Sequence, residues 1–274
     1  MGCNAHCYMC PVHSLTRVKG AMKMDLLELV AAQIDNLPKP PNVVLHFLGE
    51  PLMDKKLEQR IKLLKKTKAS SVSFSTNSQL LDEKRAISIL ESGVDYVEFP
   101  LESLDKKVFE EIRIGLDFQT VLENITRFIQ LRDKMNKATK VMPLFIEQTQ
   151  NKDERETWVN YFEGLIDRNR GDKMRIFNIH NFGGWIDEET PISSKSCDQL
   201  SDMFVILNNG DVPLCCGDPD NKSKMGNIIS DGGILGVFNG IKFKSARAMH
   251  EGANRRRMNI CNSCNIPECS SEFI

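Results

Sequence analysis

Residues 3–11 read CNAHCYMCP and place Cys3, Cys7 and Cys10 at the spacing C-x3-C-x2-C. Three thiolates this close on one loop can all point at one centre, but they are one short of the four that close a structural zinc site or fully ligate a 4Fe-4S cluster. A cluster held by three cysteines leaves one iron open for chemistry. A zinc ion completed by His6 or His13 is the alternative that the spacing alone leaves open.

The other cysteines lie far from this loop. The chain has nine in all, and none falls between Cys10 and Cys197. A chain that used cysteine as a small core residue would place some of them in that long stretch. Two separate groups therefore predict two ligand sets, one near each end of the chain. The second group consists of Cys197, Cys215, Cys216, Cys261, Cys264 and Cys269.

The composition is that of an ordinary globular protein. The chain has 274 residues, of which 41% are hydrophobic and 27% charged, and its formal net charge is −1. Without a basic excess, nucleic-acid or membrane-surface binding gains no support. The sequence shows no apolar run long enough to span a membrane and no signal peptide. We therefore expect a cytoplasmic protein whose thiols stay reduced and bind metal rather than form disulfides.

Short apolar runs alternate with helical patterns between the two cysteine groups. This alternation, at about 30 residues per unit, predicts right-handed βαβ crossovers and a parallel sheet. The strands are almost continuously apolar, as expected where helices or a lumen cover both faces of a sheet. Strands are expected at 43–47, 72–75, 96–99, 141–146 and 174–179, and helical stripes at 26–34, 57–64, 87–90, 121–129 and 158–166.

The pattern changes after residue 186. Residues 187–191 read as a polar linker, so we place a domain boundary near residue 190, with domains at 1–190 and 191–274. Two apolar runs, 204–207 and 212–214, flank Asn208-Asn209-Gly210 and predict a β-hairpin. A short helix is expected at 242–250.

The N-terminal cysteine loop resembles the cluster loop of the radical S-adenosylmethionine (SAM) superfamily, and later segments match it in order. Gly49 and Glu50 lie in a segment similar to the family's glycine–glutamate motif, which grips the SAM amino group. Ser75 and Asn77 lie in a segment similar to the one that meets the SAM ribose and carboxylate. Arg113 matches an arginine that commonly pairs with the SAM carboxylate.

Each of these matches has a simpler structural alternative when taken singly. Gly49 could mark only a turn, Asn77 a helix cap and Arg113 a solvated charge. Matches in chain order at strand ends favour the resemblance, because barrel enzymes place their sites on that rim. His180, at the end of the last expected strand, is a further candidate to contact substrate or SAM, or a structural hydrogen-bonding group.

The resemblance implies an α/β fold, a partial (β/α)6 radical SAM barrel. Only Met1 and Gly2 precede Cys3, so either the first strand of that barrel is lacking or the start site is assigned too far downstream. The resemblance also implies SAM and a SAM-binding 4Fe-4S cluster on the three cysteines.

The C-terminal cysteines resemble the SPASM/twitch extension of the same superfamily. The spacing of Cys197, Cys215, Cys261 and Cys264, with Gly210 in the hairpin turn, implies one auxiliary 4Fe-4S cluster; a zinc ribbon is the alternative. Cys269 is read as an alternate ligand. Cys216 is either a buried bystander or a hydrogen-atom donor, which would face away from the cluster if it followed Cys215 on a strand. The run 255–257, three arginines, is a solvated face or an anchor for a negatively charged cluster environment.

The resemblance implies that an electron from flavodoxin or ferredoxin cleaves SAM, and that the 5′-deoxyadenosyl radical abstracts a hydrogen atom from the substrate. The cysteine spacing resembles that of radical SAM dehydrogenases acting on aminocyclitols, so we expect oxidation of a small hydroxylated or sugar-like substrate. The alternatives are a maturase acting on a peptide substrate, a radical epimerase using Cys216, and a truncated relative that binds metal without catalysis.

Overall fold

The computed structural model describes residues 2–186, 195–252, 254–266 and 271–274. The chain forms two compact units, which are taken separately below. The first unit comprises residues 1–8, 34–178 and 270–274, and the second comprises residues 9–33 and 179–269. The predicted boundary near residue 190 lies outside the described residues. The predicted domains, 1–190 and 191–274, did not anticipate that residues 9–33 belong with the later part of the chain.

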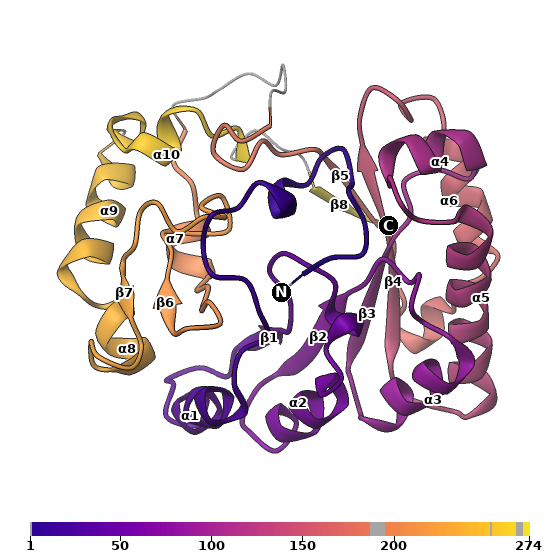
Figure 1. The fold of residues 1–274 in the computed structure, drawn as a ribbon, viewed down its shortest axis with the longest axis horizontal. Helices are drawn as coiled ribbons and strands as arrows, with labels where there is room; N and C mark the ends of the chain where they lie inside the picture. Colours follow the sequence, from indigo (N-terminus) through magenta and orange to yellow (C-terminus); the bar gives the residue numbers. More distant parts are fainter. Residues whose placement is uncertain (1, 187–194, 253, 267–270) are drawn as a thin grey trace. The chain divides into compact units, whose positions relative to one another are not determined.

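A curled six-stranded sheet forms the centre of the first unit (Figure 1). Five strands are parallel, which confirms the βαβ pattern read from the sequence. Only Gly2 is described before Cys3, so the expected lack of a first barrel strand stays a prediction. In sheet order the strands are β1 (Asn42–Val44), β2 (Ser71–Ser75), β3 (Tyr96–Pro100), β4 (Lys140–Glu147), β5 (Arg175–Asn178) and β8 (Ser271–Phe273), the last antiparallel to β5.

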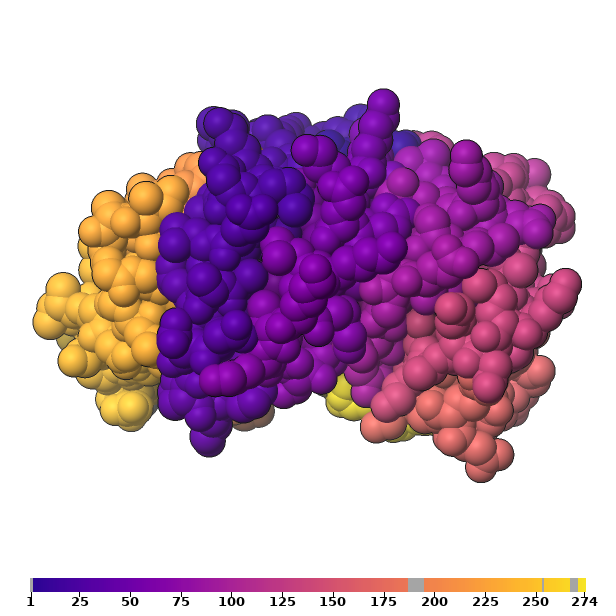
Figure 2. Space-filling model, turned by 90° about the horizontal axis from the view of Figure 1, so that it is seen from below, coloured from indigo at the N-terminus to yellow at the C-terminus, as the bar shows by residue number. Residues whose placement is uncertain are grey.

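Helices cover one face of this sheet. Val72, Phe74, Val97 and Phe99 are fully buried on that face, where Phe99 meets Phe128 edge to face with ring centroids 5.3 Å apart. Atoms of α2 and α3 form part of the outer surface of the unit in Figure 2. The helices of the first unit are α2 (Leu57–Leu64), α3 (Glu83–Glu91), α4 (Lys106–Ile112), α5 (Phe118–Lys134) and α6 (Arg155–Glu163), with the 3-10 turns η2 (Pro51–Met53) and η3 (Arg168–Arg170).

The opposite face of the sheet differs from the expectation of continuous apolar strands. Alternate residues of β2 and β3 on this face are polar, among them Ser73 and Glu98. Successive side chains of a strand point to opposite faces, so these polar groups all face away from the helices. The open face is therefore lined by groups that can bind a polar ligand.

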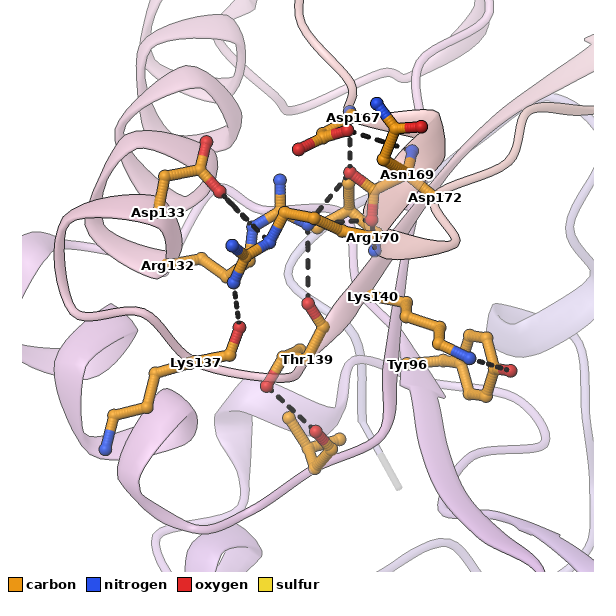
Figure 3. A network of polar contacts seen from close by, with 12 residues as sticks. Tyr96, Arg132, Asp133, Lys137, Thr139, Lys140, Asp167, Asn169, Arg170 and Asp172 are labelled. Carbon is orange, nitrogen blue, oxygen red and sulfur yellow. Dashed lines mark hydrogen bonds and ion pairs between the residues drawn. The ribbon is translucent and has the colours of Figure 1, made fainter.

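A buried ion pair fixes the start of β4 (Figure 3). The guanidinium of Arg132, on α5, lies 2.7 Å from the carboxylate of Asp172, and both side chains are fully buried. The same carboxylate accepts hydrogen bonds from the backbone N–H groups of Val141 (2.9 Å) and Asp167 (3.0 Å). The end of α5, the start of β4 and the backbone at Asp167 thus meet at one carboxylate.

Short elements make up the second unit. α9 confirms the helix expected at 242–250. In the described residues, no helix is long and apolar enough to cross a membrane. The elements of this unit are η1 (Pro11–His13), α1 (Met24–Ile34), α7 (Gln199–Asp202), β6 (Asp211–Val212), β7 (Gly226–Asn227), α8 (Gly233–Phe238), α9 (Ile241–Glu251), η4 (Arg255–Arg257) and α10 (Asn259–Asn262).

The predicted hairpin is wrong in its pairing. The turn at 207–210 does form, with Gly210 at φ 84°, a left-handed conformation that suits glycine. However, residues 204–207 are not a strand, and β6 pairs instead with β7. The reason lies in packing, because Phe204 contacts Phe238 and Phe243 at ring-centroid distances of 6.0 and 5.9 Å.

Candidate functional site

The carboxylate of Glu50 joins the loops that follow β1 and β2. It is only 2% exposed. One oxygen accepts hydrogen bonds from the backbone N–H of Leu52 (2.9 Å) and the hydroxyl of Thr76 (2.7 Å), and the other accepts one from the backbone N–H of Asn77 (2.9 Å). Burial raises the pKa of Glu50, and the three hydrogen bonds oppose that shift. The preceding Gly49 has φ 108°, which allows the tight approach to this position.

Asn77 links this carboxylate to the first cysteine. Its side-chain amide lies 4.0 Å from the sulfur of Cys3 and donates a hydrogen bond to the side chain of Asn4 (2.9 Å). The backbone N–H of Glu50 donates to the carbonyl of Gly2 (3.0 Å). The structure therefore brings Cys3, Glu50 and Asn77 together, although they lie in three separate sequence segments.

Ser75 takes part through its backbone rather than its side chain. Its N–H donates to Nδ1 of His46 at 2.9 Å. Burial lowers the pKa of His46 to about 4, so the ring is neutral and can accept this hydrogen bond. The sequence reasoning missed His46 and Thr76 as contributors. Thr76 lies within the segment 75–77 that resembles the SAM-contacting one, but nothing in the spacing marked His46.

Arg113 contacts Cys7 and is held by Glu102. Its Nη1 lies 3.5 Å from the sulfur of Cys7, and its Nε donates to Glu102 at 2.6 Å, with a second contact from Nη2 to the same carboxylate. Burial alone would lower the pKa of Arg113, but the charges of Glu102 and Cys7 outweigh it and raise the pKa. Arg113 therefore stays charged beside the Cys7 sulfur and is not the solvated helix charge considered as its alternative.

Backbone hydrogen bonds hold the cysteine loop against the end of α4. The N–H of His6 donates to Ile114 (2.7 Å), and that of Tyr8 donates to Ile112 (2.9 Å). Cys10 follows three residues after Cys7 and is the N-cap residue of η1 in the second unit. The loop that carries the N-terminal cysteines thus has a fixed backbone at Cys7.

Cysteines of the second unit gather around one point. Cys215 and Cys261 are buried and pack with Leu200, Leu214 and Ala246. Burial first, and then the nearby sulfurs of Cys215, Cys264 and Cys197, together raise the pKa of the Cys261 thiol to about 12, against the opposing charge of Arg255. The pKa of Cys197 is raised first by burial, then by Cys215 and Cys264. A shared cationic centre would stabilise the thiolate forms of these cysteines, which otherwise raise one another's pKa.

The backbone at Gly217 lies close to these sulfurs, and the tightest contact of a Cβ there would be with the side chain of Ile266, at 3.1 Å. The N–H of Gly217 donates to the sulfur of Cys215 at 3.3 Å. A Cβ at this position would lie 3.5 Å from the Cys215 sulfur and 3.8 Å from the Cys264 sulfur. Hydrogen bonds from backbone N–H groups to cysteine sulfur help set the properties of iron–sulfur clusters. The arrangement fits a cluster between Cys215 and Cys264.

Two buried cationic or polar side chains support the Cys261-x2-Cys264 loop. Arg255 is 1% exposed and donates from Nη1 to the carbonyl of Cys261 and from Nη2 to the carbonyl of Cys264, both at 3.3 Å. Nε2 of His250 lies 3.5 Å from the sulfur of Cys261. Of the three arginines at 255–257, Arg255 therefore fits the predicted anchor of the cluster environment, whereas Arg256 and Arg257 are exposed and fit the alternative of a solvated face. His250 was not anticipated.

Cys216 does not face away from the cysteine group. The reasoning that placed Cys215 and Cys216 on opposite faces of a strand is wrong, because residues 215 and 216 lie in a turn. A hydrogen bond with Cys215 lowers the pKa of Cys216, whose sulfur also lies 3.6 Å from the side-chain oxygen of Gln199. His180 lies in the second unit and stacks edge to face on Phe182 at 4.1 Å. Cys269 lies outside the described residues.

A family model for the radical SAM superfamily matches residues 1–157, more than half of the chain. The chain belongs to the radical SAM superfamily. A second model, for the SPASM iron–sulfur cluster-binding domain, matches residues 197–265. Both resemblances drawn from the cysteine groups are confirmed.

Relatives with known names match over different lengths. The S-adenosyl-L-methionine-dependent 2-deoxy-scyllo-inosamine dehydrogenase of Niallia circulans is 24% identical over 98% of this chain and 91% of its own length. A probable GTP 3′,8-cyclase of Methanococcus maripaludis is 27% identical, but over 47% of this chain and 43% of its own length. The first similarity extends through both the barrel and the cluster-binding region.

Solved structures share the fold. BtrN in complex with AdoMet and 2-DOIA superposes with a TM-score of 0.66 at 21% identity, covering 96% of this chain and 89% of BtrN. Streptococcus suis SuiB bound to its precursor peptide SuiA gives a TM-score of 0.68 at 14% identity, covering 97% of this chain and 68% of SuiB. Similarity at this level shows the radical SAM fold of the chain.

The residues present fit the cofactors of the radical SAM and SPASM domains, namely SAM, its 4Fe-4S cluster and an auxiliary iron–sulfur cluster. None of the eight described cysteines forms a disulfide. No three His, Cys, Asp or Glu side chains of the described residues are grouped closely enough for a single metal ion. A 4Fe-4S cluster binds each cysteine to a different iron, so its ligands do not need that spacing.

We expect Arg255→Met to remove the auxiliary iron while leaving the first site loaded. The variant deletes two buried charge-assisted hydrogen bonds to the ligand loop. Iron in anaerobically reconstituted protein should fall from about eight atoms per chain, two complete clusters, toward about four. The control is Arg256→Met, at the exposed neighbouring position, which should keep full iron. Equal iron in both variants would contradict the role of Arg255 as an anchor.

Proposed function

We propose that this radical SAM enzyme dehydrogenates a small hydroxylated, sugar-like substrate, converting an alcohol to a ketone. The supporting observation is the similarity to the 2-deoxy-scyllo-inosamine dehydrogenase over 98% of the chain. The similarity to GTP cyclases covers less than half of it. The gathering of Cys197, Cys215, Cys261 and Cys264 adds support, because a cluster closed by four thiolates can serve as an electron acceptor.

The proposal assigns a role to each group of site residues. The domain division stays at 1–190 for the barrel and 191–274 for the cluster-binding extension. Cys3, Cys7 and Cys10 hold the SAM-binding 4Fe-4S cluster, and Cys197, Cys215, Cys261 and Cys264 hold the auxiliary one. SAM binds at Gly49, Glu50, Ser75, Asn77 and Arg113, with His180 toward the SAM adenine or substrate.

Residues of this chain provide the hydrogen-bonding groups and the charge that orient SAM in this site. Bound there, the cluster and SAM would supply the radical chemistry that removes a hydrogen atom from the substrate. Glu50 accepts three hydrogen bonds, and a carboxylate has roughly four acceptor positions, so one remains for the SAM ammonium. Arg113 keeps a positive charge beside Cys7, and Asn77 offers its amide next to Cys3. The electron donor in this proposal is flavodoxin or ferredoxin in the cytoplasm.

The test is anaerobic reconstitution followed by incubation with SAM, reductant and 2-deoxy-scyllo-inosamine. We expect SAM cleavage and a ketone product, formed in deuterated water without deuterium at the reacting carbon. The triple variant Cys3→Ala, Cys7→Ala, Cys10→Ala should cleave no SAM yet retain about four irons, since four thiolates close the auxiliary cluster without these residues.

Other outcomes would identify the alternatives. Deuterium incorporation that disappears in Cys216→Ala would make the protein an epimerase. SAM cleavage with turnover of a peptide but of no cyclitol would make it a maturase. Bound zinc without sulfide, together with no SAM cleavage, would make it a non-catalytic metal-binding relative.

A further inference from the structure

A pocket of about 390 Å³ lies on the open face of the sheet in the first unit. Its volume is within the range of small-molecule sites. Most of the lining comes from alternate residues of three neighbouring strands, so it belongs to the face that the helices do not cover. The strand residues that line it are Asn42 of β1, Ser71 and Ser73 of β2, Tyr96 and Glu98 of β3, and Lys140 and Met142 of β4, and the pocket extends to Ser70, Asp95 and Ala138 at the N-terminal edge of the sheet.

Glu98 lies at the end of this pocket nearest the candidate SAM site. It pairs in register with Ser75, the last residue of β2. Its backbone carbonyl accepts a hydrogen bond from the N–H of Thr76 at 3.1 Å. Thr76 in turn donates to the carboxylate of Glu50. A ligand bound against Glu98 would therefore lie one strand position from the loop that carries Asn77.

The other charged groups of the pocket already have partners. Asp95 accepts from Lys65 (2.7 Å) and from the backbone N–H of Val72 (2.8 Å). Lys140 lies 3.2 Å from the hydroxyl of Tyr96, to which it points in Figure 3. These contacts leave Glu98 as the charged lining residue still to be accounted for.

The Glu98 carboxylate receives no hydrogen bond from any side chain in the described part of the chain. Burial raises its pKa, and the charge of Arg175 opposes that shift from a distance. Arg175 is held elsewhere, by Ser271 (3.1 Å) and against the ring of Phe177 (4.9 Å). Glu98 is half-buried in the strand. An ionised carboxylate only accepts hydrogen bonds, so a cationic donor in the pocket is the partner that suits it best.

We propose that this pocket binds the substrate and that Glu98 accepts hydrogen bonds from a substrate ammonium group, while the hydroxyl of Ser73 meets a substrate hydroxyl. The substrate class is then a small hydroxylated amine. This inference rests on the proposed function and adds to it the residue that recognises the amine. Glu98 is assigned to binding and takes no part in the redox chemistry.

The test compares Glu98→Gln with wild-type holoenzyme loaded with SAM. Calorimetry measures the Kd of 2-deoxy-scyllo-inosamine and of a neutral analogue that carries a hydroxyl in place of the amine. The loss of a charged hydrogen bond predicts about 10–100-fold weaker binding of the amine. The Kd of the neutral analogue should change by less than about threefold, because only the charge is lost. Glu91→Gln, at an exposed position on α3, should leave both Kd values unchanged.

Several results would overturn the inference. If Glu98→Gln weakened binding of the amine and of the neutral analogue equally, Glu98 would only maintain the fold. The urea midpoint of Glu98→Gln checks that the fold is intact, which an unchanged midpoint would show. An unchanged Kd for the amine would remove Glu98 from its recognition. Wild-type holoenzyme that binds neither probe would also overturn the inference. If that same protein cleaved SAM with another substrate, the radical SAM activity would hold although the inference about Glu98 failed.

Discussion

Replacing Asp172 by alanine is expected to lower the free energy of unfolding of the first unit by about 3–5 kcal/mol. The carboxylate is fully buried and bonds Arg132 at 2.7 and 2.8 Å as well as two backbone N–H groups. Removing it leaves the guanidinium of Arg132 buried without its main counter-charge. Breaking a buried pair costs more than the pair contributes, because the remaining charge stays desolvated.

Urea denaturation followed by fluorescence measures this loss. The chain has two tryptophans, and Trp158 is fully buried in the first unit. A Trp185→Phe background removes the other, which lies in the second unit, so that the signal reports the first unit alone.

Asp133 supplies the matched control. It also pairs with Arg132, at 2.7 Å, but its side chain is 46% exposed. Asp133→Asn should therefore cost less than about 1 kcal/mol. A loss as small for Asp172→Ala as for Asp133→Asn would show that burial does not decide the strength of this pair.

Much of the barrel could be predicted because its signals are local. The five parallel strands and the helices between them each carry their own hydrophobic period. β8 could not be predicted, since it is three residues long and pairs with β5, about a hundred residues earlier in the chain. The open polar face was also missed, because apolar runs do not reveal which face lacks a covering layer.

The make-up of the second unit depends on long-range polar contacts that leave no periodic signal. The carboxylate of Asp220 accepts hydrogen bonds from the backbone N–H groups of Thr16 (2.7 Å) and Arg17 (2.8 Å). Gln33 likewise accepts a hydrogen bond from the N–H of Ile234 at 2.6 Å. These contacts group residues 9–33 with the C-terminal region, and no composition change in the sequence marks them.

The candidate site was predictable where residue type and spacing carry the chemistry. The cysteines and Glu50 belong to compact motifs, so their positions followed from the sequence. Glu102 and His250 were not singled out, because each contacts a site residue that lies 11 positions away in the chain, Arg113 and Cys261 respectively. Arg255 stood in a run of three arginines, and its burial alone distinguishes it from the other two.

Replacing Arg113 by methionine is expected to destabilise the first unit by about 3–5 kcal/mol and to weaken the cluster held by Cys7. Glu102 is fully buried and would lose its counter-charge. The sulfur of Cys7 would lose a cationic donor at 3.5 Å. These two effects share one side chain, so a single variant does not separate them.

A double-mutant cycle with Glu102→Met separates the two effects. Apolar replacement of both partners removes the unpaired buried charge, so the double variant should recover most of the lost stability. The cation beside Cys7 stays absent, and reduction adds negative charge to the cluster there. The reduction potential of the first cluster should therefore remain more negative than in the wild type. Redox titration in a Cys261→Ala, Cys264→Ala background measures this potential without the auxiliary cluster. If the double variant regained both wild-type stability and wild-type potential, Arg113 would act on the fold alone, through Glu102, with no influence on Cys7.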